Sequence, residues 1–107
     1  MAIISLSAIE LKNRLAEGDD LYLLDVREPQ EFQYARIDGS TLIPLQQIPQ
    51  RFSELDPARV IVVICHHGMR SMQAAHFLAQ QGFANIANLT GGIDAWSLTC
   101  DSSVPRY

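Results

Sequence analysis

One short segment combines a thiol with residue types that can stabilise an anion. It reads Cys65-His66-His67-Gly68-Met69-Arg70-Ser71. The segment follows an apolar, β-branched run, Val60 to Ile64, and precedes a stretch with helical periodicity. A loop that leaves the carboxyl end of a buried strand and enters a helix lies where open α/β sheets bind ligands. This loop is therefore the candidate site for chemistry.

The predicted surroundings of Cys65 make it a candidate nucleophile. The loop N–H groups can curl inward, Gly68 permits the backbone angles that such a curl needs, and the helix N-terminus adds positive charge. This field should stabilise the thiolate, which is the reactive form of cysteine, over the thiol. A cysteine that only ended a core strand would be inert. The glycine, arginine and helix start that follow favour the functional interpretation.

The other loop residues, His66 to Ser71, form the candidate substrate-binding set. Arg70 has two interpretations: it could pair with the anionic end of a substrate such as a thiosulfonate, or form a structural salt bridge with Asp25 or Glu28. Ser71 is predicted to be the N-cap of the following helix. Met69 belongs to the set as a member of the loop.

The histidines raise the question of a metal ion. His66 and His67 adjoin Cys65, but adjacent residues on one loop rarely face the same ion, and no Cys-x-x-Cys pair accompanies them. The sequence therefore predicts neither a metal site nor an organic cofactor. The two histidines either line the mouth of the pocket or are exposed loop residues.

Apolar runs alternate with helical patterns along the chain, which is typical of an α/β domain with a largely parallel sheet. Ser7 and Glu10 form a capping box for a first helix that Gly18 ends. Strands are expected at 21–24, 41–43, 60–64 and 86–89, with 60–64 central in the sheet. Further helices are expected at 29–32, at 71–81 and around Trp96, and an irregular tail from about residue 98.

Length and composition set limits on the function. The chain has 107 residues, enough for one domain spanning 1–107, and its charged fraction of 19% and net charge of -4 are ordinary for a globular protein. Nucleic acids and anionic membranes are unexpected partners, because binding them needs clustered cations. No apolar run approaches the ~20 residues of a membrane helix, and Met1 to Ser7 does not resemble a signal peptide. We expect a cytoplasmic protein.

The order and spacing of several motifs resemble the rhodanese-like family over nearly the whole chain. The active-site loop matches C-x-x-G-x-R-S. The flanking motifs are Leu24 to Phe32, Ile37 to Ser40, Ile43 to Leu45, Ala74-Ala75, Gly82-Phe83, Asn88-Leu89, Gly91 to Ile93 and Ala95-Trp96. The family often has Gly-His where this chain has Ala35-Arg36, a difference that concerns backbone geometry more than chemistry.

The resemblance implies a three-layer α/β fold, with a mostly parallel five-stranded sheet flanked by helices. It also implies a thiosulfate sulfurtransferase, in which Cys65 takes sulfur from a small anionic donor such as thiosulfate. Cys65 would hold the sulfur as a persulfide and pass it to cyanide, a low-molecular-weight thiol or a protein thiol. Cys100 matches no family motif; it could resolve an oxidised Cys65 as a disulfide or be an incidental thiol.

Two other functions stay open at this point. A non-catalytic rhodanese-like binding module would use the fold only to display a surface, although such modules commonly lack the cysteine. A cysteine-dependent phosphatase would also cradle an anion between cysteine and arginine. Related phosphatases have one more residue between the two, however, and the smaller ring here suits sulfur better than phosphate.

Overall fold

Within the described part of the chain, five strands form one parallel sheet, as predicted. The computed structural model describes residues 3–107. The strands are β1 (Ile4–Leu6), β2 (Leu21–Asp25), β3 (Thr41–Leu42), β4 (Val60–Ile64) and β5 (Ile86–Leu89), in the order β1-β5-β4-β2-β3. Every pairing is parallel, and β4 takes the central place that its run of β-branched residues predicts. The three-residue edge strand β1 was not located from the sequence.

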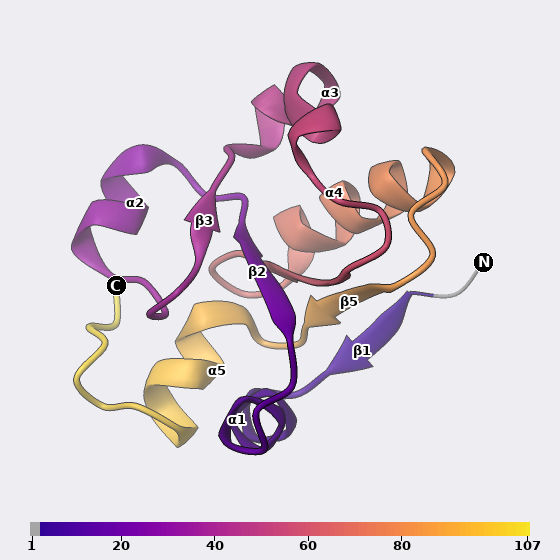
Figure 1. Cartoon of the computed structure of the whole chain (residues 1–107). Helices are drawn as coiled ribbons and strands as arrows, with labels where there is room; N and C mark the ends of the chain where they lie inside the picture. The colour runs from indigo at the N-terminus through magenta and orange to yellow at the C-terminus, as the bar shows by residue number, and fades with distance from the viewer. Residues whose placement is uncertain (1–2) are drawn as a thin grey trace.

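Helices cover both faces of the sheet, which gives three layers (Figure 1). The α-helices are α1 (Ala8–Ala16), α2 (Pro29–Tyr34), α3 (Ile48–Arg51), α4 (Met69–Gln80) and α5 (Gly92–Thr99). The capping box of Ser7 and Glu10 is present at the start of α1. The sequence did not predict α3 or the 3₁₀ turns beside it, Leu45–Gln47 and Phe52–Glu54. Pro49 lies in the first turn of α3, where a helix tolerates proline.

The side chains of β4 alternate between two cores, because successive strand residues point to opposite faces. Val62 and Ile64 pack with α1 and α5, in the cluster that contains Leu11 and Trp96. Ile61, Val63 and Cys65 belong to the other cluster, which contains the α4 residues Ala74, Ala75 and Leu78. The end of β4 is thereby fixed from both sides.

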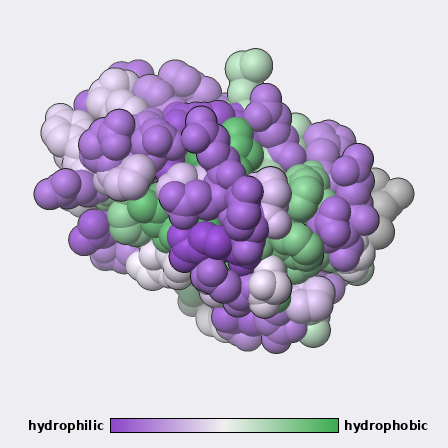
Figure 2. Space-filling model, turned by 90° about the horizontal axis from the view of Figure 1, so that it is seen from above, coloured by the Kyte–Doolittle hydropathy of each residue, from purple (hydrophilic) through white to green (hydrophobic). Residues whose placement is uncertain are grey.

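The surface of the described part is mixed. Figure 2 shows hydrophilic side chains over much of one face, with apolar areas between them. Within residues 3–107, no helix has the length and apolarity needed to cross a bilayer.

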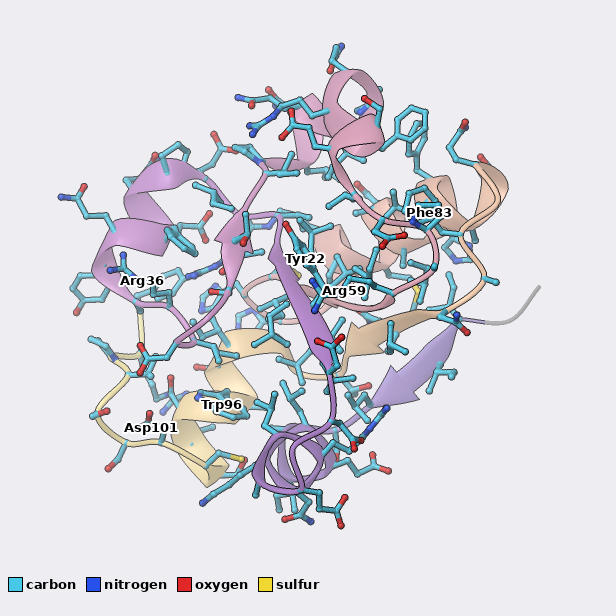
Figure 3. The ribbon with its side chains drawn as sticks, viewed as in Figure 1. Tyr22, Arg36, Arg59, Phe83, Trp96 and Asp101 are labelled. Carbon is cyan, nitrogen blue, oxygen red and sulfur yellow. The ribbon has the colours of Figure 1, made fainter. Side chains whose placement is uncertain are left out.

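Figure 3 labels residues of two contacts, one between α5 and the sheet and one between the neighbouring strands β2 and β4. Trp96 projects from α5 into the core between that helix and the sheet, and 8% of it is exposed. At the amino ends of β2 and β4, the Arg59 guanidinium lies 5.2 Å from the centre of the Tyr22 ring.

Ala35, where the family often has glycine, has φ -152° and ψ 132°, an extended conformation open to any residue.

Two segments, the start of α4 and the C-terminal tail, differ from expectation. α4 begins at Met69 with Gly68 as its N-cap, two residues before the predicted start at Ser71. The tail from Cys100 to Tyr107 has no helix or strand, as expected, but Val104 is buried and the chain returns to lie beside α2 (Figure 1).

Candidate active site

The loop after β4 is held by the first turn of α5. The Cys65 carbonyl accepts a hydrogen bond from the Ile93 N–H (2.9 Å), and the His66 carbonyl accepts one from the Asp94 N–H (3.1 Å). In a trans peptide the N–H points opposite to the carbonyl. The N–H groups of His66 and His67 therefore point away from α5. Gly92 makes this close approach feasible, because any side chain there would meet the loop carbonyls.

The sulfur of Cys65 faces the start of α4. Its Sγ accepts a hydrogen bond from the Gly68 N–H at 3.0 Å, and the Ser71 Oγ lies 3.3 Å away. Gly68 has φ 111°, a left-handed conformation that few other residues adopt. Although only 1% of Cys65 is exposed, it lines a pocket of about 210 Å³ together with His66, His67, Met69 and Arg70. The sulfur thus borders both a pocket and the positive end of a helix.

Ser71 does not cap α4, contrary to the sequence prediction. The left-handed Gly68 lets the helix start earlier, so Ser71 lies inside the first turn and is fully buried. Its hydroxyl is thereby free to contact the Cys65 sulfur and to donate to Asn88 Oδ1. Asn88 Nδ2 also donates to the Gly68 carbonyl at 3.3 Å. Asn88 was missed as a site residue, although an amide in the middle of an apolar strand is a signal for a buried polar contact.

Arg70 lies at the pocket but carries a structural salt bridge as well. Its Nη1 and Nη2 lie 2.7 and 2.9 Å from the two carboxylate oxygens of Glu31 in α2. The sequence interpretation had named Asp25 or Glu28 as partners, which is wrong: Asp25 pairs with the buried Arg27 instead. Hydrogen bonding to Arg70 lowers the pKa of Glu31 to about 2, so Glu31 stays ionised at neutral pH.

His66 lies between two other rings. It stacks on His67 (centroids 3.9 Å apart) and on Tyr107 (3.9 Å, interplanar angle 10°). Burial, together with the neighbouring His67, lowers the pKa of His66. His67 and Met69 are the exposed members of the loop, and 80% of Met69 is exposed at the rim of the pocket.

Tyr107 is a second residue that sequence reasoning missed. Its hydroxyl accepts a hydrogen bond from Arg27 Nη1 and donates one to Glu31 Oε2, both at 2.8 Å. Burial raises the pKa of Tyr107 to about 12. Nothing in the polar tail sequence signals that its tyrosine joins the active-site loop.

One group of side chains has the composition of a metal site. The ligand atoms of His66, His67 and Asp94 lie within 4.8 Å of one another. The two imidazole planes are close to parallel, however, at 27°, so their in-plane lone pairs run side by side and do not converge on one point. Asp94 also pairs with Arg106 at 2.9 Å. This geometry does not fit the tetrahedral arrangement of a zinc site.

Cys100 lies apart from the loop. It packs against the core shared by α1 and α5, whereas Cys65 belongs to the core on the other face of the sheet. Both cysteines are free thiols. This placement favours the incidental-thiol interpretation of Cys100 over a resolving role.

The sequence is similar to known proteins of one family. The family model for the rhodanese-like domain matches residues 7–99. A sulfurtransferase of Allochromatium vinosum is 41% identical over 87 residues, which cover 81% of each chain. The thiosulfate sulfurtransferase GlpE of Pseudoalteromonas translucida is 32% identical, over 86% of this chain and 88% of the relative.

Longer proteins and solved structures also match. A rhodanese-like/PpiC domain-containing protein of Arabidopsis thaliana chloroplasts is 44% identical, but the match spans only 31% of its length. The crystal structure of a rhodanese-like domain protein from Staphylococcus aureus superposes with a TM-score of 0.83 at 27% identity, covering 98% of this chain and 99% of that one.

Proposed function

The chain belongs to the rhodanese-like domain family, and on this premise we propose that it moves a sulfane sulfur from a donor such as thiosulfate to a thiophilic acceptor, cyanide or a thiol. Relatives that it matches over most of their length are named sulfurtransferases. The proposal extends these names to a particular donor, a particular acceptor and the residues that perform the transfer.

One contact carries the proposal: the hydrogen bond from the Gly68 N–H to Cys65 Sγ, at 3.0 Å. A backbone N–H at a helix N-terminus can donate a hydrogen bond to a negatively charged sulfur. A persulfide requires the same stabilisation of negative charge, because its outer sulfur is also an anion. The loop can therefore stabilise both the resting nucleophile and the covalent intermediate.

The proposed transfer has two half-reactions. In the first, the Cys65 thiolate attacks the outer sulfur of thiosulfate. A new S–S bond forms, and the S–S bond of the donor breaks with its electron pair going to sulfite. In the second, the acceptor attacks the outer sulfur of the Cys65 persulfide. Cyanide leaves as thiocyanate, a thiol leaves as a persulfide, and the Cys65 thiolate is restored without any external oxidant.

The loop residues have separate roles in this scheme. Backbone N–H groups from His66 to Ser71 stabilise the transferred sulfur electrostatically. The Ser71 hydroxyl, 3.3 Å from Cys65 Sγ, orients the sulfur. His66, His67 and Met69 form the pocket wall that the donor meets, and Arg70 lies at the rim.

We also propose that the protein works in the cytoplasm, because a nucleophilic thiol needs a reducing compartment to stay reduced. The acceptor there would be a low-molecular-weight thiol or a thiol on another protein, since a bound persulfide has to be delivered onward.

Steady-state kinetics test the proposal. With thiosulfate and cyanide both varied, thiocyanate production should follow a ping-pong pattern of parallel double-reciprocal lines. Cys65→Ser should produce none, and Cys100→Ser should retain the wild-type rate. Intersecting lines, or equal activity in Cys65→Ser, would contradict the covalent route. A folded wild type that turns over no sulfane donor would favour the binding-module function.

A further inference from the structure

The arginines around the active-site loop are paired with carboxylates. Arg27 pairs with Asp25 at 2.7 Å, Arg106 with Asp94 at 2.9 Å, and Arg70 with Glu31 at 2.7 Å. Among the described residues that line the pocket of Cys65, Arg70 is the one permanently cationic side chain. Its charge is therefore the one that a donor meets, and Glu31 sits directly against it.

Glu31 is held in place by more than Arg70. Its Oε1 also accepts the Glu28 N–H at 3.0 Å, and its Oε2 also accepts the Tyr107 hydroxyl at 2.8 Å. The Glu31 side chain is 17% exposed and that of Arg70 is 35% exposed. An ion pair fixed in this way does not open easily to let an incoming anion replace the carboxylate.

From this arrangement we infer that Glu31 sets the charge selectivity of the donor site: it cancels the charge of Arg70, so the pocket favours singly charged organic sulfane-sulfur donors, thiosulfonates and organic persulfides, over the dianion thiosulfate. The inference rests on the proposed sulfurtransferase function. It makes Glu31 a positioning residue, which acts through Arg70 without touching the donor.

The physical basis is that an electrostatic interaction scales with the charge of the donor. Beside a neutral ion pair, thiosulfate gains little from Arg70, yet it must still leave water with two charges. A singly charged donor loses less hydration free energy on binding. Its organic part can also contact the exposed Met69 at the rim. Thiosulfate remains a substrate, stabilised by the loop N–H groups alone.

The test compares two donors that share the same reacting bond. Thiosulfate carries two charges and methanethiosulfonate one, and both transfer their outer sulfur with a sulfur oxyanion as the leaving group. We expect Glu31→Gln to raise kcat/KM about tenfold for thiosulfate and about threefold for methanethiosulfonate, because the unpaired Arg70 attracts each in proportion to its charge. The gain should appear mainly in KM and shrink in 1 M salt, where the screening length is about 3 Å.

Two further variants separate charge from structure. Glu31→Gln combined with Arg70→Gln removes both charges and should return the ratio of the two kcat/KM values to near the wild-type ratio. Glu17→Gln removes an exposed charge at the C-cap of α1 and should leave the ratio unchanged.

The outcomes are distinct. A Glu31→Gln protein that loads sulfur with an unchanged donor ratio, or with both rates lowered equally, would overturn the inference and give Glu31 a merely structural role. A wild type that takes sulfur from neither donor would instead overturn the proposed function.

Discussion

Gly92 lies so close to the carbonyl oxygen of Cys65 that a Cβ built on it would come within 3.0 Å of that oxygen. The same Cβ would meet the His66 carbonyl, and Gly92 has φ 59°, where side chains are strained. The first turn of α5 can bind the loop carbonyls only because residue 92 has no side chain. Gly92, the first residue of α5, therefore shapes the loop that follows Cys65, although it is distant from Cys65 in the sequence.

Gly92→Ala should displace the loop. We expect a loss of about 3 kcal/mol in the free energy of unfolding and a large loss of sulfur loading, both measured on the purified variant. Gly39→Ala is the matched control, because Gly39 also has positive φ (84°) but a Cβ added there would meet no other atom within 4 Å. It should cost about 1 kcal/mol and leave loading intact. Equal effects of the two substitutions would refute the steric argument.

Ser71→Ala should slow persulfide formation. It removes the hydroxyl next to Cys65 Sγ and leaves Asn88 Oδ1 without its donor in a buried setting. We expect a loss of stability of about 1–2 kcal/mol. Loading should be slower by about tenfold in single-turnover experiments, because Asn88 without Ser71 holds the Gly68 carbonyl less firmly and the loop N–H groups are less well placed.

Ser97→Ala is the control for that experiment. Ser97 is also buried, and its hydroxyl donates to the Ile93 carbonyl at 3.0 Å within α5, away from the sulfur. It should lower stability without slowing the loading step. If the two variants slowed loading equally, the role of Ser71 would be architectural.

The ion pair of Glu31 and Arg70 makes a prediction about acid stability. The pKa of Glu31 is lowered to about 2 in the folded protein, against roughly 4.3 in an unfolded chain. Its contribution is therefore fully present above about pH 4.3 and is lost as the pH falls toward 2. Because the pair is partly exposed and screened, we expect Glu31→Gln to cost about 1 kcal/mol at pH 7. Urea unfolding at several pH values should show this difference shrinking below pH 4; a constant difference would contradict it.

The spacing of the loop predicts which anions it admits. Four residues separate Cys65 from Arg70, and we expect no hydrolysis of p-nitrophenyl phosphate by the wild type. Insertion of one glycine after Gly68 should enlarge the ring and allow phosphate or vanadate to bind, as measured by calorimetry. Turnover of the phosphate ester by the wild type would revive the phosphatase alternative.

Much of the fold could be predicted because local signals agreed with the tertiary arrangement. The β-branched run Val60–Ile64 marked the central strand, and Ser7 with Glu10 marked the start of α1. Short elements escaped prediction. β1 has three residues, and α3 has four and contains Pro49. Segments this short carry too little periodicity to be recognised.

The sequence identifies the candidate site residues that are contiguous and misses those that only the fold brings to the loop. Cys65 to Ser71 form one loop, so the sequence shows them together. Asn88, Glu31 and Tyr107 come from β5, α2 and the tail, and their contacts with the loop depend on tertiary packing. The cap of α4 was misassigned because a left-handed glycine took the place expected for the serine.

The covalent intermediate itself is the most direct test. Intact-protein mass spectrometry after incubation with a sulfane donor should show one added sulfur atom, about 32 Da, on the wild type and on Cys100→Ser. Cys65→Ser should show none, and cyanide should remove the added mass as thiocyanate. An equal mass gain on Cys65→Ser, or a gain that disappears only in Cys100→Ser, would contradict the assignment of Cys65 as the sulfur carrier.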